Sequence, residues 1–125
     1  MPALQKAPSW LPVNPDYKKL NVATAQQSDT SLLNTVRRLL WLRKNSSALN
    51  YGSLNILSNV PRQVLAFKRV HGAEEITIYL NLSAKAQIIK NEYSAGQLLF
   101  SLPFGYVPPD NKVILPAYGA LIIKK

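Results

Sequence analysis

Carboxylates and one histidine are the side chains of this chain that could carry acid–base chemistry. Hydrolysis by a carboxylate pair needs two groups held about 5–10 Å apart across the scissile bond. Glu74 and Glu75 are adjacent at the start of a predicted strand, so their side chains should point to opposite faces and are interpreted as turn and surface groups. Asp29 suits a helix cap and Asp110, after two prolines, suits a turn. The full acidic set is Asp16, Asp29, Glu74, Glu75, Glu92 and Asp110.

The other routes to catalysis lack the residues that they require. The single histidine, His71, stands beside Gly72 in a predicted turn, and no second histidine and no cysteine exist to share a metal ion. A nucleophilic serine would need His71 as its base and a glycine-flanked elbow, and the sequence has no such elbow. The five glycines form no phosphate-binding loop. We therefore predict no catalytic, cofactor-binding or metal-binding residue and no cofactor.

Aromatic rings are the remaining side chains with a possible binding role, because they can stack on sugar rings. The same rings more often support packing and turns, which is the favoured interpretation for each of them. A carbohydrate-binding β-sandwich module with weak sugar affinity therefore stays open as an alternative function. The candidate rings are Trp10, Tyr17, Trp41, Tyr51, Tyr93, Tyr106 and Tyr118.

The charge balance raises the question of nucleic acid. Fifteen basic and six acidic residues give a net charge of +9, which favours polyanion binding. The basic residues are dispersed and come at most in pairs, and no nucleic-acid motif is visible. A nucleic-acid-binding protein is thus the least favoured function, and we predict no nucleic-acid partner. The excess of positive charge also suits a surface whose acidic counterpart lies on a missing partner domain.

Length and composition predict one globular domain. A chain of 125 residues with 47% hydrophobic residues can bury a core, which argues against disorder. No apolar run approaches the roughly 20 residues that cross a bilayer, and the first residues lack the apolar core of a signal peptide. We predict no membrane partner. The compartment stays undetermined, with the cytoplasm slightly favoured.

One amphipathic helix is the strongest predicted element. Residues 1–30 contain four prolines and no regular period, which predicts an irregular segment. Ser28, Asp29 or Thr30 should cap a helix over residues 31–44, and Asn45 or Asn50 with Gly52 should form the turn or left-handed positions after it. Trp41 lies outside the apolar stripe, so the helix should pack on more than one neighbour. The stripe is formed by Leu32, Leu33, Val36, Leu39 and Leu40, at 3/4 spacing.

The rest of the chain has the pattern of short strands. Turn-rich stretches separate them at near-regular spacing, and no helix alternates with them. Residues 75–82 alternate isoleucine and leucine with Thr77, Tyr79 and Asn81, which predicts a half-buried strand. The fold class is therefore mainly β: an antiparallel, Greek-key β-sandwich of about seven strands, preceded by one amphipathic helix and an irregular segment. The predicted strands are "YGSLNIL", "QVLAFKRV", "EITIYLNL", "AQIIK", "QLLFS", "NKVIL" and "GALIIKK".

A series of motifs, in order, resembles the C-terminal part of α-glucosidases of glycoside hydrolase family 13. The motifs are "WLPVNPDYKKLNV", "SLLNTVRRLLWLRK", "ALNYG", "VLAFKR" and "IYLNLS", followed by the closing "LPAYGALIIKK". The resemblance is best over residues 9–84 and is nearest to oligo-1,6-glucosidases, maltases, and trehalose- or isomaltulose-forming enzymes. The matching residues are Trp10 to Asn14, Tyr17, Asn21, Val22, Gln26 or Gln27, Ser31 to Leu33, Leu42 to Lys44, Ala48, Leu49, Gly52, Phe67, Arg69, Asn81 and Ser83.

The resemblance implies a domain layout and a role. Residues 1–30 would be the last loop of a (β/α)₈ barrel, residues 31–48 its last helix, and residues 49–125 the β-sandwich called domain C. The family's catalytic motifs lie upstream of this part, so the chain by itself would be non-catalytic, either a truncated gene product or an expressed piece. Its role would be to stabilise the catalytic barrel of an enzyme that acts on α-glucosidic bonds. The expected partner is that barrel, or a second copy of the chain through the 31–44 face.

Overall fold

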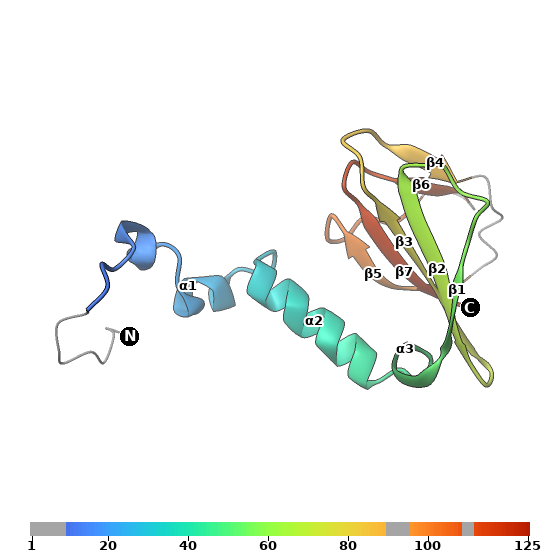
Figure 1. The fold of residues 1–125 in the computed structure, drawn as a ribbon, viewed down its shortest axis with the longest axis horizontal. Coiled ribbons are helices and arrows are strands. Elements are labelled where there is room, and N and C mark those ends of the chain that lie inside the picture. The colour runs from blue at the N-terminus through green and yellow to red at the C-terminus, as the bar shows by residue number, and fades with distance from the viewer. Residues whose placement is uncertain (1–9, 90–95, 109–111) are drawn as a thin grey trace. The chain divides into compact units, whose positions relative to one another are not determined.

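The computed structural model describes residues 10–89, 96–108 and 112–125. Within it the chain divides into two compact units, Met1–Trp41 and Leu42–Lys125. Helices make up the first unit and two β-sheets dominate the second (Figure 1). The predicted residues Glu92, Tyr93 and Asp110 lie outside the described part of the chain.

Two asparagines organise the start of the first unit. The 3₁₀-helix η1 (Pro15–Lys18) begins after Asn14, whose side chain accepts the N–H of Asp16. Helix α1 (Val22–Gln27) begins after Asn21, whose Oδ1 accepts the N–H of Thr24 at 2.8 Å and whose Nδ2 donates to the carbonyls of η1. The prediction of an irregular segment over residues 1–30 was therefore incomplete. These helices are too short to show a periodic apolar pattern, and they depend on their caps.

Helix α2 (Leu32–Lys44) forms where the apolar period predicts it. Its cap differs from the prediction: the Ser31 hydroxyl accepts the N–H of Asn34 at 3.2 Å, the hydrogen bond of an N-cap. Asp29 instead forms an ion pair with Arg38, at 3.8 Å between carboxylate and guanidinium. The hydroxyls of Ser28 and Thr30 lie within hydrogen-bond distance of each other, at 3.3 Å. Ser31 directly precedes the first residue of α2 and therefore occupies the N-cap position, which was predicted one to three residues too early.

The turn predicted after α2 is present at Asn45, but Asn50 and Gly52 form no left-handed positions, because the chain forms another helix there. Helix α3 (Ser47–Tyr51) begins after Ser46, whose buried hydroxyl accepts the N–H of Leu49. Gly52 follows with a φ of −66°, which any residue can adopt. Glycine is required for space instead: a Cβ there would lie 2.3 Å from the carbonyl oxygen of Ala48.

Seven antiparallel strands appear in the described residues, and each predicted strand is present. Five of them form one sheet in the order β1-β2-β3-β7-β5, and β4 and β6 pair in a second sheet (Figure 1). The chain alternates between the sheets from β3 onward, which is how β7 comes to lie between β3 and β5. The strands are β1 (Ser53–Ile56), β2 (Val64–His71), β3 (Glu74–Asn81), β4 (Gln87–Ile89), β5 (Gln97–Leu102), β6 (Val113–Leu115) and β7 (Ala120–Lys124).

The hairpin between β2 and β3 confirms the short turn predicted at "HGAE". His71 pairs with Glu74, so Gly72 and Ala73 form a two-residue loop. Gly72 has a φ of +57°. A positive φ at the first loop position is typical of the type II′ turn, which fits the twist of antiparallel strands.

Strand β3 is buried on both faces, so the prediction of a half-buried strand was wrong. Ile76 and Ile78 pack on Ala48 of α3 and on Ile122 of β7. On the other face, Tyr79 packs on Leu115 and other residues of the β4–β6 sheet, and Asn81 is also buried. Alternation of apolar and polar residues in a strand normally indicates that one face is exposed to solvent. Here the second face can be buried, because it carries the Tyr79 ring and the side-chain amide of Asn81, whose polar atoms are hydrogen-bonded.

Candidate docking surface

The helical unit has no core of its own in its described residues. None of residues 10–41 is buried, whereas all buried hydrophobic residues of the described chain lie between Ala48 and Ile123. Apolar side chains of α2 are open to solvent: Leu32 is 80% exposed, Leu40 60% and Trp41 66%. Large exposed apolar surfaces on a soluble protein usually mark an interaction site. The described part of the chain contains no helix long and apolar enough to cross a bilayer.

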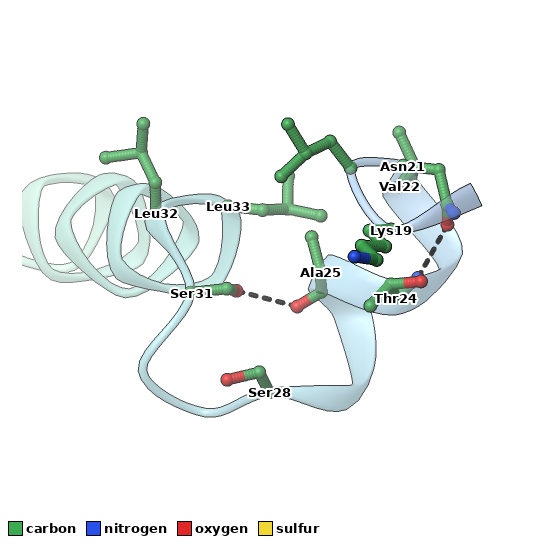
Figure 2. Close-up of a pocket in the computed structure, with 10 residues that line it drawn as sticks. Lys19, Asn21, Val22, Thr24, Ala25, Ser28, Ser31, Leu32 and Leu33 are labelled. Carbon is green, nitrogen blue, oxygen red and sulfur yellow. Dashed lines mark hydrogen bonds between the residues drawn. The ribbon is translucent and has the colours of Figure 1, made fainter. Parts of the chain in front are cut away.

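A corner between α1 and α2 holds a concave part of this surface. The Ser31 hydroxyl donates to the Ala25 carbonyl at 2.6 Å, and the Asn34 amide donates to the carbonyls of Ala25 and Gln26 at the end of α1 and of Ser28 just after it. Figure 2 shows Leu33 extending from α2 toward α1, and the Ser31–Ala25 bond that fixes the corner. The result is a cleft of about 590 Å³. Its apolar lining includes Leu20, Val22, Ala25, Leu32 and Leu33.

Apolar residues occur on more than one side of α2. Successive residues of an α-helix are about 100° apart, so Leu32, Val36 and Leu40 share one stripe, while Trp41 lies a quarter turn or more away from it. A helix that is apolar on several sides is normally buried on several sides. The arrangement therefore calls for cover on both the stripe and the Trp41 side.

The sheet unit offers a second open apolar surface. One face of the five-stranded sheet is closed by β4 and β6, with Val113 and Leu115 fully buried between the sheets. The opposite face is covered by α3 only near Ala48. On that face Ile56 pairs with Phe67, and Leu65 with Leu80, so these side chains point to the same side of the sheet. Ile56 is 70% exposed and Leu65 39%, so this face is only partly closed.

The predicted sugar-stacking rings are mostly exposed but have separate surroundings. Trp10 lies near the start of the described chain and Trp41 on α2, while the ring of Tyr51 packs on His71 with 6.1 Å between centroids and a tilt of 51°. The Tyr106 hydroxyl donates to the Ile114 carbonyl at 2.7 Å, and burial raises the pKa of this phenol. Tyr106 is thus a packing residue.

The Glu74 carboxylate has a structural role, although several polar groups surround it, as they often surround a carboxylate in a functional site. The carboxylate accepts the N–H of Ala48 at 2.8 Å and the hydroxyl of Ser47 at 3.0 Å, and it forms an ion pair with Lys124 at 3.1 Å. The backbone hydrogen bond from Ala48 is the largest cause that lowers the pKa of Glu74 from 4.5 to about 2, and burial opposes it. The interpretation of Glu74 as a turn and surface residue was therefore wrong: it joins α3 to the sheet.

Glu75 points to the other face of β3, as predicted. Its carboxylate accepts a hydrogen bond from Lys68 at 2.7 Å, which is the main cause that lowers the pKa of Glu75. Glu74 and Glu75 thus serve two separate ion pairs. Sequence reasoning identified the opposite faces but not the partners, because the lysines lie on other strands.

Comparison with known proteins identifies the family. The model for the alpha-amylase catalytic domain matches residues 3–52. The chain is 29% identical over 119 residues to the oligo-1,6-glucosidase of Bacillus cereus, covering 92% of this chain and 21% of that protein. It is 30% identical over 93 residues to the glucan 1,6-alpha-glucosidase of Streptococcus dysgalactiae subsp. equisimilis, covering 74% of this chain and 17% of that protein. The chain thus spans about a fifth of the length of these relatives.

Solved structures agree with this assignment. A variant of the isomaltulose synthase of Erwinia rhapontici NX5 matches with 26% identity and a TM-score of 0.77, over 92% of this chain and 21% of that chain. A trehalulose synthase variant matches with 22% identity and a TM-score of 0.79, over 93% of this chain and 22% of that chain, which shows the fold alone. The chain belongs to the α-amylase family, glycoside hydrolase family 13, and its curated relatives are α-glucosidases and related enzymes of this family. The resemblance drawn from the sequence motifs is confirmed.

The family match and the structure divide the chain at different residues. The catalytic-domain match ends at Gly52, directly before β1. The compact sheet unit begins earlier, at Leu42. Residues 42–52 therefore belong to the catalytic domain by sequence and to the sheet unit by packing, since Ala48 and Leu49 contact the sheet core.

Proposed function

We propose that this chain is the non-catalytic C-terminal part of an α-amylase-family glycosidase that acts on α-glucosidic bonds. Residues up to 48 supply the last loop and helix of the catalytic barrel, and residues 49–125 form domain C. The chain stabilises the barrel by covering its flank. The observation that carries this proposal is α2: it lies within the catalytic-domain match, yet its apolar side chains are open to solvent on more than one side.

The carboxylates of the sheet unit support a non-catalytic role. Glu74 and Glu75 are each engaged by a lysine, and Glu74 also caps α3. A pair that hydrolyses a glycoside must face one bond from two sides. Glu74 and Glu75 point to opposite faces of β3, so they do not share a substrate site.

Complementation in trans tests the stabilising role. The Bacillus cereus oligo-1,6-glucosidase is produced without the segment that matches this chain, and the full chain is added to it. We expect recovery of soluble protein and of isomaltose hydrolysis, because α2 and the open sheet face regain their cover. Leu40→Asp should abolish the recovery, since it places a charge on the apolar stripe.

The matched control is Ile88→Asp, which changes an exposed apolar residue of β4, in the sheet unit, in the same way. Equal recovery by wild type and by Leu40→Asp would contradict the proposal. Titration of the chain alone with isomaltose and maltose separates it from the carbohydrate-binding alternative, which requires a response at millimolar sugar.

A further inference from the structure

Arg37 is a charged residue near the middle of α2 that a partner covering this helix has to accommodate. Within helical spacing it lies one turn from three apolar neighbours, Leu33 before it and Leu40 and Trp41 after it. It therefore lies between the apolar stripe and the Trp41 side. A partner that covers both of these sides must also cover the Arg37 guanidinium.

Arg37 has no acidic partner within the part of the chain that the structure describes. Arg38, the next residue, pairs with Asp29 at 3.8 Å, whereas none of the ion pairs between described residues involves Arg37. Glu74 and Glu75 are engaged by Lys124 and Lys68. Helix α2 itself contains four basic residues and no acidic one.

An unpaired arginine is costly to bury. Removal of a charge from water costs several kcal/mol unless a counter-charge and hydrogen bonds replace the water. The guanidinium matches a carboxylate with two parallel hydrogen bonds, which makes this pair the common solution at covered sites. The chain's net charge of +9 also favours a partner with acidic groups, because an acidic partner surface would balance this charge.

We propose that the partner surface that covers α2 carries a carboxylate paired with Arg37. This inference rests on the proposed function, since it takes the partner to be the catalytic domain. It adds a specific polar contact to an otherwise apolar interface. The carboxylate sets the register of α2 on its partner, because Arg37 is the arginine near the middle of α2 that lies between the two apolar sides.

Titration of the full chain into the truncated Bacillus cereus enzyme tests the pair. Binding is measured for wild type, Arg37→Met, Arg37→Lys and Arg62→Met, at about 50 mM and about 500 mM salt, where screening differs strongly. We expect Arg37→Met to bind at least about tenfold more weakly than wild type, because it leaves a covered carboxylate unpaired. Arg37→Lys should lie between them. Arg62→Met should match wild type, because Arg62 is an exposed arginine that does not belong to α2.

The outcomes separate the two proposals. Wild-type binding that Arg37→Met leaves unchanged would overturn the carboxylate pair and leave the proposed function standing. An absence of wild-type binding at both salt concentrations would overturn both. If the α2 surface instead joins two copies of the chain, Arg37→Met should strengthen self-association by removing like charges, and sedimentation of the chain alone would show it. If Arg37→Met and Arg62→Met weakened binding equally, both arginines would act by unspecific charge attraction. This result would also overturn the proposed Arg37–carboxylate pair.

Discussion

The helical unit and the sheet unit of this chain differ in how they are stabilised. The sheet unit buries apolar residues on both faces of its central strands, with Ile76, Leu115 and Leu121 fully enclosed. The described helical unit buries none of its residues, and its hydrogen bonds are local caps and turn bonds around Asn21, Ser31 and Asn34. Local bonds fix the shape of a segment but contribute little net stability, whereas burial of apolar surface is the main favourable term of folding. The sheet unit is therefore expected to fold alone, whereas the described helical unit lacks an apolar core of its own.

Core truncation should give the largest difference between the units. Leu121→Ala should lower the free energy of unfolding by about 3 kcal/mol, because it leaves a cavity between the sheets. Leu32→Ala, the same type of change at an exposed residue of α2, should change it by no more than about 0.5 kcal/mol. Urea unfolding followed by circular dichroism measures both values. A large effect of Leu32→Ala would show that α2 is already covered in the isolated chain.

Asn81 tests whether polar bonds matter as much as apolar packing within the sheet unit. Its side-chain amide is buried and donates to the carbonyls of Lys85 and Pro116 at 2.8 Å each, and its oxygen accepts from Ser83. Asn81→Ala should lower the free energy of unfolding by about 2 kcal/mol, since it leaves buried carbonyls unpaired. The exposed Asn55→Ala is the control. An equal effect of the two substitutions would contradict the role of Asn81.

Glu74 should link the stability of the sheet unit to acid. Glu74→Gln should cost about 1 kcal/mol at neutral pH, the usual size of a weakened helix cap. The folded-state pKa of Glu74 lies at about 2, below the ordinary 4.5, so its contribution is complete above pH 4.5 and is lost as the pH falls toward 2. Wild type and Glu74→Gln should therefore differ in stability at neutral pH and converge in this acidic window. Urea unfolding at several pH values measures the difference, and a constant gap down to pH 2 would contradict the cap.

The Lys68–Glu75 pair should give the smallest effect. Both side chains are about a third exposed, so Lys68→Met should cost about 0.5 kcal/mol at low salt and less at high salt. Unfolding curves at two salt concentrations measure it, with Lys85→Met as the control for a lysine side chain without an ion pair in the described residues. A cost above about 2 kcal/mol would indicate a buried rather than a surface pair.

The sequence predicted those features that repeat along the chain. All seven strands follow from short apolar alternations between turns, and α2 follows from its 3/4 apolar spacing. The features that were missed depend on residues far apart in the sequence. Burial of both faces of β3 requires the β4–β6 sheet, and the cap that Glu74 provides requires α3, 26 residues away. The helices η1 and α1 were missed because single asparagines, not a period, begin them.

The docking surface was predicted in part. The stripe of α2 and the expectation of several neighbours came from the helical spacing of Leu32 to Leu40 and from Trp41. The cleft at the α1–α2 corner was not predicted, because it depends on the hydrogen bonds that Ser31 and Asn34 make to the Ala25 carbonyl of α1. A serine followed three residues later by asparagine at a helix start is the signal that could have indicated it.

Native-state hydrogen exchange of the chain, alone and with the truncated Bacillus cereus enzyme, tests the central contrast most directly. Alone, the amides of β3 and β7 should open only with global unfolding, while those of residues 36–40 in α2 should open at about 1–2 kcal/mol or less, as expected for a short helix without cover. With the partner, the α2 amides should gain protection and those of β3 should change little. Amides of α2 that are as protected as those of β3 in the isolated chain would contradict the account.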